Sequence, residues 1–153
     1  MLTSAQLATL KTYIQATPAL NALYTEGNMG GLADALNADH APAFIIWRTE
    51  YTPELKAKAI DVGITQLDAL TASKRDSLLW WVNRTHNASL ANTQAAMSDL
   101  CGSQNVLKTA LIDGAKRSAT VAEKALASGT GTTASPGTPT FTGEVAWSEL
   151  IGM

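Results

Sequence analysis

The sequence predicts an all-α protein, a small multi-helix bundle over residues 1–128 that carries an extended C-terminal arm over residues 129–153. Apolar residues recur at three- and four-residue spacing up to about Ser128, which is the period of a helix with one buried face. Capping residues and prolines mark repeated helix starts. The stretch GTGTTASPGTPT from Gly129 to Thr140 has no apolar spacing at all, and an apolar tip, Phe141–Met153, follows it.

The N-terminal third predicts several short helices. Thr3 or Ser4 caps the first, and Thr17–Pro18 starts a second, because threonine is a good cap and proline suits the first helical position. Gly27 and Asn28 end that helix, and the residues after Gly31 form another short piece.

The segment Phe44–Trp47 (FIIW), just after Pro42, fits either a buried strand or a buried helical turn, which periodicity alone does not separate. We favour a buried helix end or connector, because no second strand is recognisable nearby.

The centre and the end of the bundle predict four more helices. Thr52–Pro53 starts the first, which reaches Gly63, and the second begins near Thr71. The third runs from Ser89 to Gly102, and the longest spans about Ser103 to Ser128, with small residues on its apolar face.

Composition excludes several classes of protein. Hydrophobic residues make up 46% of the chain and charged residues only 16%, so small polar residues or neighbouring subunits must cover much of the surface. We favour neighbouring subunits, because contact surfaces are poor in charge at their centres. The net charge of −2 with scattered basic residues disfavours tight binding of nucleic acid.

The chain gives no sign of secretion or of a membrane span. Cys101 is the only cysteine, so neither an internal disulfide nor a cysteine-based zinc site is expected. The N-terminus lacks the basic and apolar regions of a signal peptide, and no apolar run approaches the roughly 18 residues of a membrane span. We expect a cytoplasmic chain with no membrane partner.

No constellation of residues predicts catalysis, a metal site or a cofactor. His40 reads as a loop histidine, and His86 as a histidine at a helix end, where its imidazolium would meet the helix dipole. The carboxylates are scattered, and no nucleophile or phosphate-loop motif is present. Cys101 reads as a small buried residue. We therefore expect a protein that is not an enzyme.

Two features predict contacts with other chains. Trp80 and Trp81 point about 100° apart on a helix, so they are either two aromatics at the core edge or one core residue and one at a subunit interface. In the arm, a polar spacer leads to five apolar side chains, which we interpret as partner-binding anchors in preference to residues that fold back onto the bundle. These are Phe141, Val145, Trp147, Leu150 and Ile151.

Three segments give the chain a resemblance to head–tail connector proteins, the adaptor or head-completion proteins of tailed bacteriophages. They are WRTEYTPEL (Trp47–Leu55), LDALTASKRDSLLWW (Leu67–Trp81) and the stretch Ala115–Val145. The last is similar to the ending of small phage structural proteins, in which a helix runs into an arm.

The resemblance implies a virion protein that forms a homo-oligomeric ring, typically of twelve copies, under the portal protein. It implies an arm that binds the portal or a neighbouring subunit, a platform for tail proteins, and a channel that passes genome DNA without binding it specifically. Two alternatives stay open. One is another phage structural protein, for capsid cement or tail completion, and the other is a non-viral helical oligomeric binding module.

Overall fold

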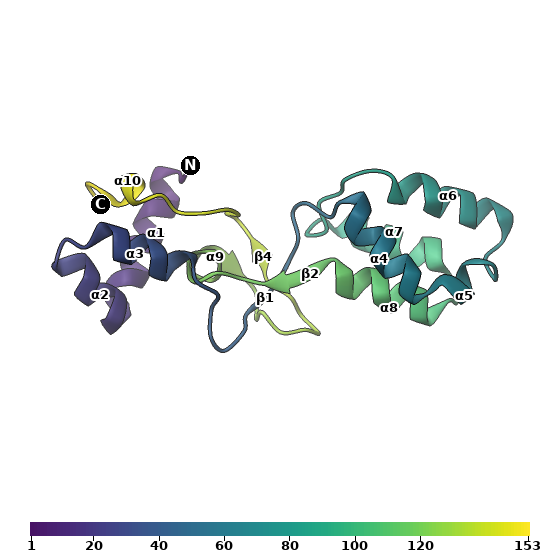
Figure 1. The fold of residues 1–153 in the computed structure, drawn as a ribbon, viewed down its shortest axis with the longest axis horizontal. Coiled ribbons are helices and arrows are strands. Elements are labelled where there is room, and N and C mark those ends of the chain that lie inside the picture. Colours follow the sequence, from purple (N-terminus) through teal and green to yellow (C-terminus); the bar gives the residue numbers. More distant parts are fainter. The chain divides into compact units, whose positions relative to one another are not determined.

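The computed structural model describes residues 1–153, which fold into two compact units. Unit 1 contains residues 1–46 and 118–153, and unit 2 contains residues 47–117. The chain passes from unit 1 to unit 2 within strand β1 (Ile45–Trp47) and returns within β2 (Lys116–Ser118), and these two strands pair (Figure 1). No helix is long and apolar enough to cross a membrane.

Unit 1 is built around helices whose starts are set by local caps. Its elements are α1 (Ser4–Ala16), α2 (Pro18–Thr25), α3 (Met29–Asn37), α9 (Val121–Leu126), β3 (Ala127–Ser128), β4 (Thr138–Pro139) and α10 (Trp147–Leu150). Thr3 forms a capping box with Gln6, and Asn28 accepts a hydrogen bond from Gly31 at the start of α3. Their apolar faces meet in one core that includes Leu10, Ile14 and Leu36.

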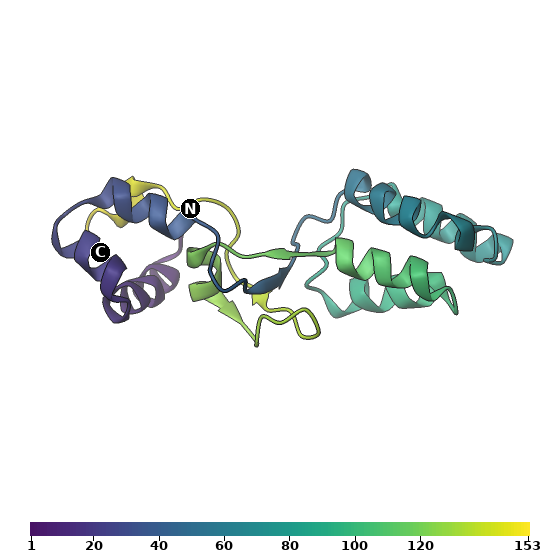
Figure 2. The ribbon, with the colours of Figure 1, turned by 60° about the horizontal axis from the view of Figure 1, so that its bottom comes forward.

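Unit 2 is a four-helix bundle with one extra turn. It contains α4 (Pro53–Val62), α5 (Ile64–Leu67), α6 (Ala72–Val82), α7 (Ala91–Cys101) and α8 (Asn105–Gly114). Helix α4 packs chiefly against α8, α8 against α7, α7 against α6, and α6 against α4, so the four helices close a circle (Figure 2). The chain approaches α8 closely at Gly63, where an added Cβ would lie 2.6 Å from the Cα of Leu107.

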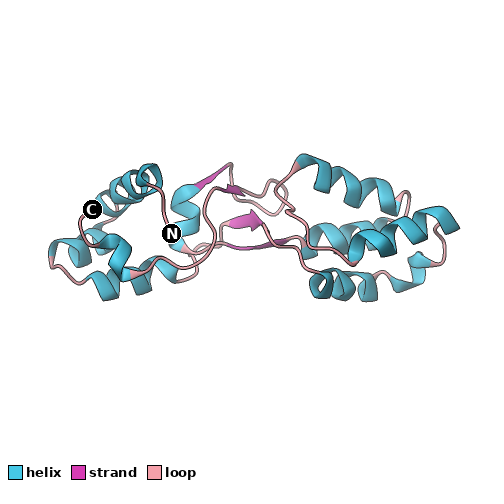
Figure 3. Ribbon diagram, turned by 90° about the horizontal axis from the view of Figure 1, so that it is seen from above, coloured by secondary structure: helices cyan, strands magenta, loops and turns pink.

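The protein is largely helical, with ten helices, but it is not purely all-α, because two small two-stranded sheets are present (Figure 3). At Phe44–Trp47 the favoured helix end or connector is wrong and the alternative of a buried strand holds, since Ile45–Trp47 is strand β1 with Ile46 fully buried. Its partner β2 lies about 70 residues later, so local sequence cannot reveal the pairing.

The long helix predicted for Ser103–Ser128 is instead broken into α8, β2, α9 and β3. Thr120 and Glu123 form a capping box that begins α9. The backbone just before this capping box is bonded to a distant segment: the Ala119 amide donates a hydrogen bond to the Phe44 carbonyl over 2.8 Å. Apolar spacing alone predicted one continuous helix over Ser103–Ser128. The capping box and this hydrogen bond explain why the helix is interrupted before Val121.

The predicted polar spacer is not extended, because its two ends pair with each other. Strands β3 and β4 pair antiparallel, with Ser128 opposite Thr138, and residues 129–137 form the loop between them. The Phe44 ring lies against two glycines of this loop, Gly131 and Gly137. The division expected at Ser128 therefore differs from the observed one, in which residues 129–153 belong to unit 1.

The contact between Phe44 and the loop predicts a cost for any side chain at Gly131. This glycine has φ +66°, and an added Cβ would overlap the Phe44 ring, which cannot retreat because Gly137 lies against it as well. We expect Gly131→Ala to lower the free energy of unfolding of unit 1 by roughly 2–4 kcal/mol, measured by urea unfolding.

The matched control is Gly30→Ala in α3, where an added Cβ meets nothing within 4 Å. It should be neutral or stabilising by up to about 1 kcal/mol, because alanine is the better helix former. Equal effects of the two substitutions would contradict the close packing of Phe44 on the loop.

Candidate functional site

The structure divides the five predicted anchors of the C-terminal segment, residues 140–153, into two groups. Phe141, Val145 and Leu150 are buried in the core of unit 1, with Val145 and Leu150 only 1% exposed. Trp147 and Ile151 are 58% and 60% exposed. The first three fill a core of their own chain and are not surface anchors, whereas the last two face solvent.

Polar side chains hold the C-terminal segment along its length. Asn37, at the end of α3, donates from Nδ2 to the Val145 carbonyl over 3.0 Å and accepts from the Val145 amide over 2.8 Å. Tyr24 donates its hydroxyl to the Met153 carbonyl over 2.7 Å. The Gln6 side chain donates to the Thr140 carbonyl over 2.8 Å. These side-chain hydrogen bonds satisfy backbone N–H and C=O groups of the segment that are not paired with a strand.

Glu149 joins the C-terminal segment to the start of the chain. One carboxylate oxygen accepts from the Leu2 amide over 2.6 Å, and the other accepts from the Ala146 amide over 3.1 Å. These hydrogen bonds, of which the one from Leu2 contributes most, hold the pKa of Glu149 below its ordinary value. The carboxylate is therefore charged at neutral pH and fixes both termini in unit 1.

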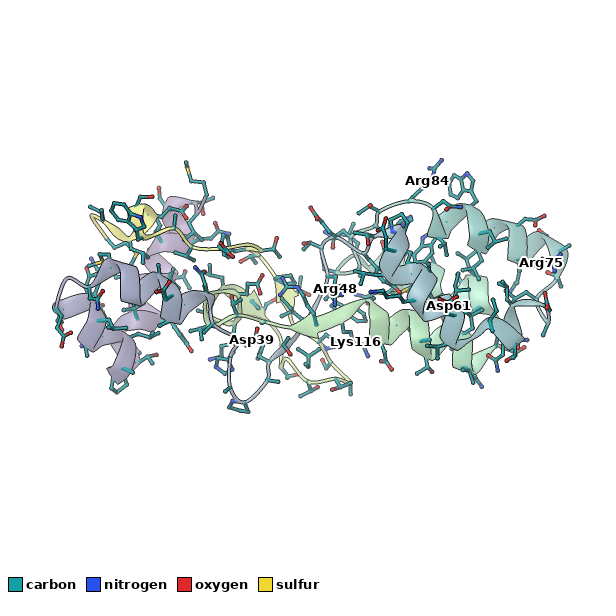
Figure 4. The ribbon with its side chains drawn as sticks, viewed as in Figure 1. Asp39, Arg48, Asp61, Arg75, Arg84 and Lys116 are labelled. Atoms are coloured by element: carbon teal, nitrogen blue, oxygen red, sulfur yellow. The ribbon has the colours of Figure 1, made fainter.

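The two tryptophans of α6 have different places. Trp81 is 6% exposed and belongs to the core of unit 2, where it lies edge-on to Tyr51 with ring centroids 6.3 Å apart. Trp80 is 59% exposed, and the Arg84 guanidinium lies 3.7 Å from its ring centroid. Arg84 projects outward from the helices (Figure 4). Of the predicted pair, only Trp80 offers a ring to a partner.

A groove of about 670 Å³ lies beside Trp80, between α6 and α7. Ala96 and Leu100 supply apolar surface from α7, and Asp76 and Asp99 place a carboxylate on each wall. An exposed aromatic ring beside an apolar groove is typical of a contact surface, in which buried aromatic side chains contribute most of the binding energy.

Lys56 is a feature that the sequence did not reveal. It is fully buried, and no carboxylate pairs with it. Its Nζ donates to the Arg84 carbonyl, contacts His86 Nδ1 at 2.6 Å and lies 4.3 Å from the Trp81 ring centroid. The helical period could have identified it, because Lys56, Ala59 and Ile60 share the buried face of α4.

Burial lowers the pKa of Lys56 to about 8. Burial, and next the charge of Lys56, lower the pKa of His86 as well, so a neutral imidazole accepts from the lysine. The His86 ring stacks on Trp81 with centroids 4.5 Å apart. His86 is not at a helix end as predicted, because α6 ends at Val82 and His86 forms a β-bridge with Tyr51. A buried amine of lowered pKa is a nucleophile only if a substrate reaches it, and Lys56 has no exposed surface.

The remaining candidates are isolated. His40 Nδ1 lies 2.7 Å from the Pro42 carbonyl in an exposed loop. Cys101 is fully buried in the core of unit 2, as predicted, and burial raises the pKa of its thiol to about 11. No group of three His, Cys, Asp or Glu side chains is arranged to hold a metal ion.

No protein-family model matches the chain, and no curated protein or solved structure is significantly similar to it.

The paired bonds of Asn37 predict that this side chain holds the C-terminal segment in place. We expect Asn37→Ala to lower the free energy of unfolding of unit 1 by about 1–3 kcal/mol, because two buried backbone groups of Val145 lose their partner. Hydrogen exchange at the Val145 amide should accelerate. The matched control, Asn21→Ala on α2, removes a side chain that forms no hydrogen bond and should leave that exchange rate unchanged.

The environment of Lys56 predicts a particular pH dependence. Because its pKa is lowered to about 8 in the fold, the unfolded chain binds more protons than the folded chain above that pH. Its contribution to stability therefore rises with pH from about 8 towards the ordinary lysine value.

We expect the free energy of unfolding of the wild type, minus that of Lys56→Met, to increase from pH 7 to pH 9 in urea titrations. Taking the difference cancels the titration of the other groups. Lys58→Met on the exposed side of α4 should show no such increase. A flat difference for Lys56→Met would show that Lys56 is not desolvated.

Proposed function

We propose that the chain is a structural virion protein of a tailed bacteriophage, an adaptor that forms a ring between the portal and the tail and extends the DNA channel. The observation that carries the proposal is the exposure of large apolar side chains on both units in a chain with few charges, above all Trp80 beside its groove and Trp147 with Ile151. The choice of a head–tail connector over other assemblies is supported by the resemblance to connector proteins in three segments, Trp47–Leu55, Leu67–Trp81 and Ala115–Val145.

The two units supply separate contact surfaces in this proposal. In unit 1, the candidate portal contact is reduced from the five predicted residues to Trp147 and Ile151. The other three residues are buried in the core of unit 1 and cannot contact a partner. Ile151 also borders a hollow of about 280 Å³ with Leu7, Lys11 and Met153. In unit 2, the surface around Trp80 is the candidate contact between subunits.

Charge agrees with a channel protein that does not retain DNA. The net charge is −2, so the chain supplies no excess of cations with which to neutralise phosphates. Passage without specific binding is what a channel requires, and a strongly basic lining would oppose it.

Labelled particles test the proposal directly. We expect antibody against this chain to decorate purified virions of its phage at one vertex, seen by electron microscopy, because an adaptor ring occupies the portal vertex alone. The double variant Trp147→Ala/Ile151→Ala, which leaves the buried side chains in place, should be lost from that vertex while unit 1 remains folded.

Other outcomes identify the alternatives. Label over the whole capsid would mean a cement protein, and label at the far end of the tail would mean a tail-completion protein. A chain that is made in infected cells but is absent from particles would contradict the proposal and favour a non-virion binding module.

A further inference from the structure

Residues 83–87, between the end of α6 and the buried Ala88, form a short irregular segment over the amine of Lys56. The first three of these residues are exposed, and the segment has no helix of its own. The backbone bonds that join it to a distant part of unit 2 are the reciprocal pair between His86 and Tyr51, over 2.8 and 3.2 Å. A segment held by so few bonds can open while the surrounding helices stay folded.

Lys56 binds this segment from the inside. An ammonium has three N–H donors. One donates to the Arg84 carbonyl and one to His86 Nδ1, which lies 2.6 Å from the nitrogen. The third faces the aromatic rings of Trp81 and Tyr51, whose centroids lie 4.3 and 5.1 Å from Nζ. All the donors of this buried amine are therefore used, and two of them hold the segment.

The charged groups around His86 are all cations. Lys56 and Arg84 both disfavour the imidazolium, and no carboxylate forms an ion pair with any of the three residues. Tyr51 is the other titratable group at the Lys56 amine. Its hydroxyl donates to the Leu111 carbonyl over 2.9 Å, and burial raises its pKa, so it stays neutral. No negative charge is present to stabilise a second proton at this place.

Protonation of His86 is incompatible with its contact to Lys56. The neutral ring accepts a hydrogen bond at Nδ1, whereas the imidazolium carries N–H groups on both nitrogens. Two donors that are both positively charged cannot remain 2.6 Å apart, so one of them has to move. Lys56 is fully buried on α4, but His86 is only half-buried and belongs to the irregular segment. The imidazole is therefore the group that moves.

We propose that residues 83–87 form an acid-sensitive lid over Lys56: protonation of His86 separates its ring from the amine, and the lid leaves the face of Trp81. The lid also carries Arg84, whose guanidinium lies 3.7 Å from the centroid of the exposed Trp80 ring. Opening therefore uncovers Trp80 as well. The lid concerns unit 2 alone, and its existence does not depend on the adaptor proposal.

The direction of the pH dependence follows from the two states of the lid. The pKa of His86 is lowered in the closed state by burial and next by Lys56, and it returns towards the ordinary histidine value of about 6.5 when the lid opens. Above that pH both states hold a neutral ring, and the lid stays closed. Below it only the open state binds the proton, so acid favours opening.

Amide hydrogen exchange of the full chain, followed by NMR at pH 7.5 and pH 5, measures this opening. The Tyr51 and His86 amides are bonded across the lid. After correction for intrinsic exchange rates, we expect their protection to fall by about 10- to 30-fold at pH 5, as one proton is taken up by a group of ordinary histidine pKa. Amides of Leu78, Met97 and Leu111, inside the helices, should keep their protection. The Trp80 indole resonance should shift over the same pH range.

His86→Asn tests whether this histidine is the sensor. Asparagine keeps an acceptor near the position of Nδ1 but does not titrate, so the acid-dependent loss of protection at Tyr51 should disappear. The matched control is His40→Asn. His40 is the only other histidine and lies in an exposed loop of unit 1, so this variant should respond to acid as the wild type does.

Lys56→Met tests whether the amine drives the opening. Without the cation, a protonated Nδ1 can stay in place and donate to the Arg84 carbonyl, 3.1 Å away. The protection of the Tyr51 amide in this variant should therefore change less than about 2-fold between the two pH values, against about 10- to 30-fold in the wild type.

Four results would overturn the inference. In the wild type, these are a Tyr51 amide without protection at pH 7.5, equal protection at both pH values, and a loss at pH 5 that Leu78, Met97 and Leu111 share, which means unfolding of the whole unit. The fourth is a wild-type acid response in His86→Asn, which would assign the proton to another group.

Discussion

The burial of three C-terminal side chains in unit 1 is the constraint on which the rest of that unit depends. Phe141, Val145 and Leu150 close a core formed by α1, α2, α3 and α9. Burying an apolar side chain of this size contributes about 1.5–3 kcal/mol, so the three contribute at most roughly 5–9 kcal/mol. A whole domain is stable by about 5–15 kcal/mol. The C-terminal segment therefore cannot leave unit 1 without a large loss of its stability.

This magnitude changes what the segment can do for function. A free arm would offer all five apolar residues to a partner, but a partner would have to compensate for the loss of Phe141, Val145 and Leu150 from the core. Trp147 and Ile151 carry no such cost, because they already face solvent. The polar contacts of Asn37, Tyr24 and Glu149 hold the backbone that presents them. A rigid presentation of two exposed side chains loses less entropy on binding than an arm that must first order itself.

The sequence predicted most helix starts because caps are local. Thr3, Thr17–Pro18, Thr52–Pro53 and Thr71 each precede a helix at the expected place. The sequence could not predict β1 and β2, because their pairing joins residues about 70 positions apart. The capping box at Thr120 was missed because the apolar residues on both sides of it keep the helical spacing. Of the candidate site, the apolar pattern identified Phe141, Val145 and Leu150, but we interpreted them as anchors for another chain, whereas the structure buries them in the core of their own unit. The sequence identified Trp80 and Trp81 as a pair of candidate contact residues. Only the tertiary packing shows that Trp81 is the core residue and Trp80 the exposed one.

Removal of the C-terminal segment tests most directly whether unit 1 depends on it. A chain of residues 1–139 can be compared with the full chain by amide hydrogen exchange in the cores of both units. We predict that protection of Leu10, Ile14 and Leu36 is lost, while protection of Leu78, Met97 and Leu111 in unit 2 is retained. If the truncated chain keeps full protection throughout unit 1, the segment is a dispensable arm, and its burial is not the constraint that holds unit 1 together.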